Sequence, residues 1–131
     1  MEKAFAFLDS NRNVLQTVQQ ITLRDFASRQ NLEISFVGAE IVGNEQKHRL
    51  LLYYIRESKN TNFIFYTINQ FKEQDQYDLD YVKLAINNGI NIYFAAEKIS
   101  IRNEKELDKL NRHIDIISAI KKNNALEYFL K

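Results

Sequence analysis

Short apolar runs and helical patterns alternate along most of the chain. The four apolar runs span residues 4–8, 34–39, 63–68 and 90–95. Runs of this length, rich in aromatic and β-branched residues, are typical of strands that are buried on both faces, as parallel strands are. The helical patterns between them span residues 14–30, 44–55 and 78–86. This order predicts one three-layer α/β domain, with a mostly parallel four-stranded sheet and helices on both faces.

The first helical pattern has apolar residues on two sides. The main stripe contains Val14, Leu15, Val18, Ile21 and Phe26. A stripe of this kind is the face that a helix turns toward the core. It also includes Asp25 by angle, and we expect this carboxylate to pair with Arg24 or Arg29. Leu23 and Ala27 lie on the opposite side, so the helix is expected to make contacts on two faces.

The last part of the chain predicts a long C-terminal helix. Its first seam contains Leu107, Leu110, Ile114 and Ile117. Ile116 and Ile120 begin a second seam, and residues 123–131 form a short amphipathic tail with Leu126, Phe129 and Leu130. We therefore divide the chain into a single α/β domain at 1–122 and a tail at 123–131. The apolar surface exceeds what one sheet contact uses, which predicts a homodimer; the alternative is that the tail folds back on its own core.

Polar residues follow the carboxyl end of each predicted strand, which is where open α/β sheets bind ligands. These residues are Asp9, Ser10, Asn11, Arg12, Asn13, Glu40, Tyr66, Asn69, Gln70, Glu97 and Arg102. A small sugar-like or anionic ligand could bind to this set of carboxylates, amides, guanidinium groups and one phenol. The helix that begins near Asn13 would add the positive end of its dipole. The alternative is that they are ordinary loop ends and helix caps.

Ser10 is the one candidate nucleophile in this set. A serine after the first strand of a parallel sheet needs an activating base or a cluster of cations. Neither His48 nor His113 has a sequence context that places it nearby, and a helix N-cap explains Ser10 without chemistry. The sequence therefore assigns no catalytic residue.

Composition excludes several classes of function. The chain has no cysteine and two histidines, so we expect no metal site, and its three glycines form no phosphate-binding loop, so we expect no cofactor. A net charge of +1 over 131 residues gives no general attraction to nucleic acid. No run of about 18 apolar residues could span a membrane, and the N-terminus lacks a signal-peptide pattern, so a cytoplasmic protein is expected.

Several short motifs resemble one small bacterial family. Residues 11–20 (NRNVLQTVQQ) and 23–26 (LRDF) are similar to the opening of the sporadic carbohydrate cluster proteins. The agreeing later segments are 39–40 (AE), 65–70 (FYTINQ), 93–97 (YFAAE) and Arg102, so the resemblance covers about residues 3–118. Leu15 stands where the family tends to have proline. The resemblance implies a role in surface-polysaccharide or nucleotide-sugar synthesis, and it carries over no catalytic residue.

The layout also resembles the catalytic domain of serine recombinases, so a resolvase-like or flavodoxin-like fold is expected. Ser10 falls near the place of that family's nucleophile. The arginine before it is absent, because residues 5–8 are apolar, and residues 66–71 replace the later arginine-rich motif. Those arginines would bind the scissile phosphate, so we do not expect DNA strand exchange.

Three functions remain open from the sequence. The first is a protein of bacterial carbohydrate biosynthesis that binds a sugar-like or anionic ligand at the strand ends. The second is a non-catalytic partner or scaffold for an enzyme of the same pathway. The third is a degenerate recombinase-like domain.

Overall fold

The computed structural model describes residues 2–9, 14–40, 49–58, 61–73 and 76–115. The elements, in chain order, are β1 (Glu2–Asp9), α1 (Gln16–Arg29), β2 (Leu32–Glu40), α2 (Arg49–Glu57), β3 (Asn62–Phe65), the 3-10 helix η1 (Ile68–Phe71), β4 (Lys72–Glu73), β5 (Gln76–Tyr77), α3 (Asp80–Asn87), β6 (Asn91–Phe94) and β7 (Ile99–Ile101). A last helix occupies residues 104–115. The predicted αβ alternation is confirmed.

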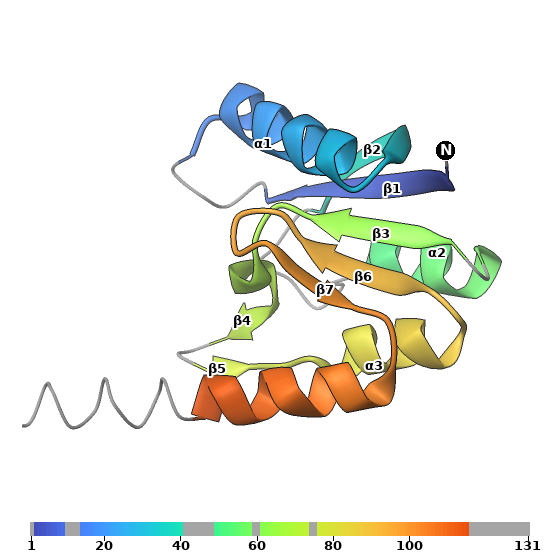
Figure 1. Ribbon diagram of the computed structural model, residues 1–131, viewed down its shortest axis with the longest axis vertical. Helices are drawn as coiled ribbons and strands as arrows, with labels where there is room; N and C mark the ends of the chain where they lie inside the picture. Colours follow the sequence, from blue (N-terminus) through green and yellow to red (C-terminus); the bar gives the residue numbers. More distant parts are fainter. Residues whose placement is uncertain (1, 10–13, 41–48, 59–60, 74–75, 116–131) are drawn as a thin grey trace, which may run out of the picture.

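The main sheet has the strand order β2-β1-β3-β6-β7 (Figure 1). The first four strands are parallel, as predicted, and β7 pairs antiparallel with β6. The prediction of four strands was therefore one strand short. β7 is only three residues long, and the chain returns to β6 through a turn in which Lys98 has a positive φ of 58°. A strand this short has too few positions to show a periodic pattern.

Helices cover both faces of the sheet, which gives three layers (Figure 1). On one face, Leu23, Phe26 and Ala27 of α1 pack on the small side chains Ala4 and Ala6 of β1. On the other face, α2, α3 and the last helix pack on the large side chains of β1, β3 and β6. The alternation of side chains along a strand produces this division.

Aromatic rings fill the core on the face of α2 and α3. Phe65 lies at its centre and is 2% exposed. Its ring stacks on that of Phe7 at a centroid distance of 5.1 Å, meets Phe71 edge-on at 4.8 Å, and lies 5.8 Å from Phe94. Offset and edge-on contacts are the arrangements that aromatic pairs prefer. These four rings join three neighbouring strands to η1.

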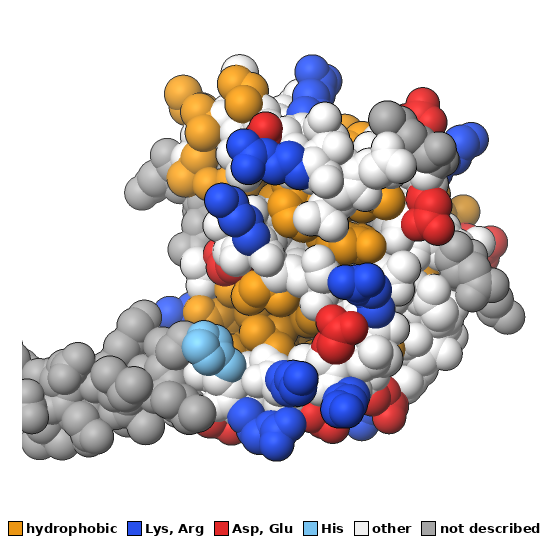
Figure 2. Space-filling model, in the orientation of Figure 1, with side chains coloured by type: hydrophobic (Ala, Val, Ile, Leu, Met, Phe, Trp, Pro, Cys, Tyr) orange, Lys and Arg blue, Asp and Glu red, His pale blue; other side chains and the backbone are white. Residues whose placement is uncertain are grey.

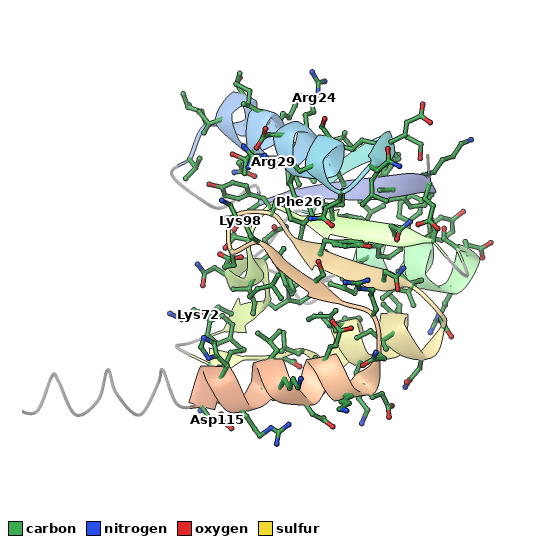
Figure 3. The ribbon with its side chains drawn as sticks, in the orientation of Figure 1. Arg24, Phe26, Arg29, Lys72, Lys98 and Asp115 are labelled. Atoms are coloured by element: carbon green, nitrogen blue, oxygen red, sulfur yellow. The ribbon has the colours of Figure 1, made fainter. Side chains whose placement is uncertain are left out.

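The predicted inward stripe of α1 faces outward for the most part. Leu15, just before the helix, is 73% exposed, and Val18 and Ile21 are 46% and 63% exposed. Of the predicted stripe, Phe26 is buried, together with Leu23 and Ala27 from the side that was expected to be secondary. Phe26 points from α1 to the sheet, where its ring lies 5.8 Å from that of Tyr93 (Figure 3). The side of α1 that packs on the sheet is therefore the one with Leu23, Phe26 and Ala27.

Asp25 lies on the exposed part of α1 and not in the core. Its Oδ2 atom is 3.1 Å from Nε of Arg29, and both side chains are well exposed. Pairing with Arg29 was one of the two predicted outcomes and is confirmed. An exposed i,i+4 pair of this kind contributes only about 0.3–0.5 kcal/mol, so it does not determine how the helix sits.

Helix ends follow their local sequence signals. α3 ends at Asn87, and Gly89 has a φ of 79°, which confirms the predicted stop at residues 87–89. Asn103 caps the last helix by accepting a hydrogen bond from the backbone N–H of Glu106 at 2.9 Å. The second helix begins at Arg49, and residues 41–48 lie outside the described residues.

One irregularity interrupts the edge strand β2. Ala4 of β1 is opposite Ile34, and the next residue, Phe5, is opposite Phe36, so Ser35 is an extra residue on β2. The Ser35 hydroxyl donates to the carbonyl of Ala4 at 3.4 Å. This is a β-bulge, which bends and twists the strand that carries it.

The predictions for residues 116–131 lie outside the described residues. They include the second seam at Ile116 and Ile120, the length of the C-terminal helix beyond Asp115, the boundary after residue 122, and the tail. No helix among the described residues combines the length and hydropathy that a membrane span requires.

Candidate functional site at the carboxyl edge of the sheet

Most of the described site candidates are brought together at one edge of the sheet. Phe7 of β1 is opposite Phe65 of β3, which is opposite Phe94 of β6, so the residues that follow these positions meet at the carboxyl edge. Asp9, Tyr66, Asn69, Gln70 and Glu97 lie there. Glu40 is opposite Asp9 in the sheet, and nothing is described of its side chain. The other candidates, Ser10, Asn11, Arg12 and Asn13, lie outside the described residues.

Gln19 of α1 ties the helix to the end of β1. Its Oε1 atom accepts from the backbone N–H of Asp9 at 2.8 Å, and its Nε2 atom donates to the Asp9 carbonyl at 2.8 Å. Nε2 also donates to the Val14 carbonyl at 3.1 Å. The side chain is fully buried. The sequence prediction missed this residue, although its position four residues before Leu23 and seven before Phe26 places it on the buried face.

Thr67 and Gln70 form a capping box around η1. The Thr67 hydroxyl accepts from the backbone N–H of Asn69 at 3.3 Å, and Oε1 of Gln70 accepts from the backbone N–H of Thr67 at 3.0 Å. Nε2 of Gln70 donates to the carbonyl of Phe7 at 3.3 Å. Gln70 therefore bridges η1 and β1. The cap also explains why β3 ends at Phe65, earlier than the predicted strand end at residue 68.

Glu97 joins the turn between β6 and β7 to the start of η1. Its Oε2 atom accepts from the Thr67 hydroxyl at 2.7 Å, and its Oε1 atom accepts from the backbone N–H of Ile68 at 2.8 Å. Thr67 is itself buried. The carboxylate thus satisfies a free N–H at the beginning of η1 and fixes the turn against it.

Asn69 connects η1 to the small hairpin of β4 and β5. Its Oδ1 atom accepts from the Tyr77 hydroxyl at 2.8 Å. The ammonium group of Lys72 lies 5.8 Å from the centre of the Tyr77 ring, within the range of a cation–π contact. The amide oxygen of Asn69 therefore has a structural role.

Arg102 lies at the opposite edge of the sheet, so its predicted placement was wrong. It follows β7, which runs antiparallel to β6, and Ile101 is opposite Ile92 near the beginning of β6. The prediction assumed that the chain after residue 97 stays at the carboxyl edge, but β7 carries it back across the sheet. Burial raises the pKa of Tyr93 in β6, and the nearby charge of Arg102 partly opposes that shift.

Asparagine side chains close the amino edge where Arg102 lies. Nδ2 of Asn91 donates to Oδ1 of Asn62 at 3.1 Å, and Nδ2 of Asn62 donates to the Lys3 carbonyl at 3.0 Å and to Oε2 of Glu2 at 3.3 Å. These bonds link β6, β3 and β1. Their role is to satisfy polar groups at the start of the strands.

Removing the Glu97 carboxylate is expected to destabilise the fold measurably. In Glu97→Ala, the N–H of Ile68 and the hydroxyl of Thr67 lose an ionised acceptor, and we expect the free energy of unfolding to fall by about 1–2 kcal/mol. Glu97→Gln keeps one acceptor oxygen and should lose about half as much. Urea unfolding followed by circular dichroism measures both, with Glu104→Ala on an exposed carboxylate as the control. Equal losses in Glu97→Ala and Glu104→Ala would contradict the assignment.

The polar groups of this edge are largely used within the protein. Gln19, Thr67, Gln70 and Glu97 each hold a backbone or side-chain group of a neighbouring element. Among the described residues, no buried side-chain nitrogen or oxygen lacks a hydrogen-bond partner. In the part of the chain that the structure describes, His, Asp and Glu side chains form no group of three or more that could hold a metal ion.

Comparison with known proteins finds solved structures of similar fold. No protein-family model and no curated protein matches the chain. A resolvase family site-specific recombinase from Streptococcus pneumoniae superposes with a TM-score of 0.65 at 12% identity, covering 99% of this chain and 94% of that one. The N-terminal catalytic domain of TP901-1 integrase gives 0.60 at 14% identity, covering 94% and 96%.

These neighbours support the fold part of the sequence prediction. The motifs similar to sporadic carbohydrate cluster proteins find no counterpart in the comparisons, so that resemblance stays a prediction. The likeness to these two structures extends over nearly the whole chain at very low identity. The chain therefore has a resolvase-like α/β fold.

Proposed function

We propose that this chain is a non-catalytic interaction domain that binds a partner protein through the outward side of α1. The observation that carries the proposal is the exposure of Leu15, Val18 and Ile21, which we call the α1 patch. Figure 2 shows hydrophobic side chains gathered over the beginning of α1. Exposed apolar area costs about 25 cal/mol per Å², and contiguous apolar patches mark interaction sites.

The carboxyl edge supports a role without chemistry. The part of this edge whose side chains are described consists of Asp9, residues 66–71 and residues 95–98. It contains two carboxylates, Asp9 and Glu97, and one cation, Lys98. Cleaving a phosphodiester requires cations or other donors placed around the phosphoryl oxygens. Binding DNA likewise requires several cations along the backbone phosphates. The strand exchange carried out by a site-specific recombinase is therefore not part of the proposal.

Affinity capture with three baits tests the proposal. The baits are the natural chain, Ile21→Lys in the α1 patch, and Leu84→Lys, which changes an exposed apolar residue of α3. A protein retained by the natural chain and by Leu84→Lys but lost from Ile21→Lys would then be purified. In a titration, we expect Ile21→Lys to raise its dissociation constant at least tenfold. Equal capture by all three baits would contradict the proposal.

A second candidate function is the binding of a sugar-like ligand at the carboxyl edge. Tyr66 favours it: the phenol is partly exposed, and its backbone is fixed by a bond from its N–H to the Phe7 carbonyl and one from the Ala96 N–H to its own carbonyl. The phenol can exchange hydrogen bonds with neutral hydroxyls, and the negative charges of Asp9 and Glu97 disfavour a polyanion. With the carbohydrate resemblance, this would place the protein in cytoplasmic polysaccharide or nucleotide-sugar synthesis, and its partner would be an enzyme of that pathway.

A thermal-shift screen tests the second candidate. Nucleotide sugars and neutral oligosaccharides are compared with a DNA duplex, and a ligand at 100 times its dissociation constant stabilises the fold by about 2.7 kcal/mol. We expect Tyr66→Phe to weaken the binding of a true ligand, while Tyr53→Phe, at an exposed tyrosine of α2, serves as the control. A shift produced by DNA alone, falling with salt, would instead favour the recombinase-like alternative.

A further inference from the structure

We propose that Asn88 is a site of deamidation that the native fold protects, and that its conversion weakens the contact between α3 and α2. Of the three glycines of the chain, only Gly89 follows an asparagine. In an asparagine–glycine pair the main chain attacks the side-chain amide most easily, because glycine has no side chain to hinder the approach. The pair lies directly after Asn87, the last residue of α3, and is separate from the α1 patch.

The reaction needs water and no other reactant. The backbone nitrogen of Gly89 attacks Cγ of Asn88, so that a new C–N bond forms and the bond from Cγ to Nδ2 breaks. The proton of the attacking nitrogen leaves with the amide as ammonia. Water then opens the resulting succinimide ring at either of its two carbonyl groups, which gives aspartate or isoaspartate. Each product carries a negative charge that asparagine lacks.

Three features of the fold oppose this attack. The N–H of Gly89 donates to the carbonyl of Ile86 at 3.0 Å, so the attacking nitrogen is held in a hydrogen bond. Asn88 has a ψ of 10°, which nearly eclipses the nitrogen of Gly89 with that of Asn88 and turns it away from the side chain. Nδ2 of Asn88 is itself held, because it donates to the carbonyl of Ile55 at 3.3 Å. The attack therefore requires the end of α3 to open first.

The bond from Asn88 to Ile55 caps α2 from a second helix. Ile55 lies in the last turn of α2, whose carbonyl groups have no partner within the helix. Its side chain is fully buried and belongs to the same core cluster as Val82 of α3, on the face of the sheet that α2 and α3 share (Figure 1). After deamidation, an oxygen replaces the donor, and a carboxylate faces the negative end of the α2 dipole. One bond between the two helices is then replaced by repulsion.

The rates of deamidation in the folded and the unfolded chain test the protection. The full-length protein is incubated in mildly alkaline buffer, with and without enough urea to unfold it, and the digested peptides are analysed by mass spectrometry. We expect Asn88 to convert at least ten times faster in urea, into both aspartate and isoaspartate. Asn31, which is followed by Leu32, is the internal control and should convert far more slowly than Asn88 in urea. Equal rates at Asn88 with and without urea, or no conversion in urea, would overturn the inference.

Asn88→Asp, made directly, tests the consequence for the two helices. We expect a lower urea midpoint than in the natural chain, and exchange of the Gly89 N–H with solvent hydrogen at least five times faster. Asn87→Asp is the matched control, because it adds the same charge at the neighbouring exposed position, and the bond from Asn88 to Ile55 is kept. Equal midpoints and equal exchange in the two variants would show that Asn88 does not join α3 to α2.

Discussion

Phe65→Ala is expected to lower the free energy of unfolding by about 3–5 kcal/mol, the usual loss for a buried phenylalanine. The ring is 2% exposed and contacts three other phenylalanine rings, so its removal leaves a cavity that rigid neighbours cannot fill. This loss is a large part of the 5–15 kcal/mol that stabilises most domains. Urea unfolding at equilibrium measures it.

Phe65→Leu is the matched variant for the core prediction. It keeps most of the apolar volume and should cost clearly less than Phe65→Ala. Phe36→Ala, at a partly exposed ring of the edge strand, should also cost less. A loss below about 1 kcal/mol in Phe65→Ala would show that this ring is not central to the core.

Gln19→Leu is expected to be nearly as damaging, by about 2–5 kcal/mol. The substitution fills a similar volume, but it leaves the N–H and carbonyl of Asp9 and the carbonyl of Val14 without the bonds that Gln19 makes. Each buried backbone group left without a partner costs about 1–3 kcal/mol. Thermal and urea unfolding measure the loss, and Gln20→Leu, the neighbouring residue on α1, is the control.

Gln19→Glu is expected to make the stability of the fold depend on pH. One oxygen of the new carboxyl can still accept from the N–H of Asp9, but the other faces two carbonyl oxygens. Burial and these oxygens favour the protonated acid, so its folded-state pKa should lie above the ordinary value of about 4.3. The variant therefore keeps its full stability below the ordinary value of about 4.3 and loses stability as the pH rises through the folded-state pKa. A stability independent of pH would argue against the hydrogen-bond geometry.

The general fold could be predicted because its signals are local and repeated. Aromatic and β-branched runs mark β1, β3 and β6, and polar or glycine residues mark the ends of α3. The parallel arrangement follows from the alternation of these elements. β7 was not predicted, because three residues are too few to show a periodic pattern. Since β7 runs antiparallel to β6, it places Arg102 at the opposite edge of the sheet.

The facing of α1 could not be predicted from its apolar stripe alone. Val18 and Ile21 are as apolar as Leu23 and Ala27, and the spacing supports either side as the buried one. Two features beyond the helix determine the outcome: the small residues of β1 beneath it, and the hydrogen bonds of Gln19 to Asp9. Both depend on residues that are distant in sequence.

Topology placed most of the described candidate residues at one edge of the sheet, and ligand binding there stays a prediction. The rule that strand ends meet at one edge correctly grouped Asp9, Tyr66, Gln70 and Glu97. A sequence cannot show that Gln70 and Glu97 bind the protein's own backbone, because that depends on turn geometry. Polar residues at strand ends therefore indicate a place in the fold before they indicate a ligand.

The bulge at Ser35 has a consequence for how the protein behaves at high concentration. β2 is nine residues long and is the last strand of the sheet on its side. A regular edge of that length would be a template for strands of other molecules, and so a route to fibrous aggregates. The extra residue breaks the regular ladder near the middle of β2, so an incoming strand could pair in register with only about half of it. Deleting Ser35 would lengthen the regular edge and make the protein less soluble.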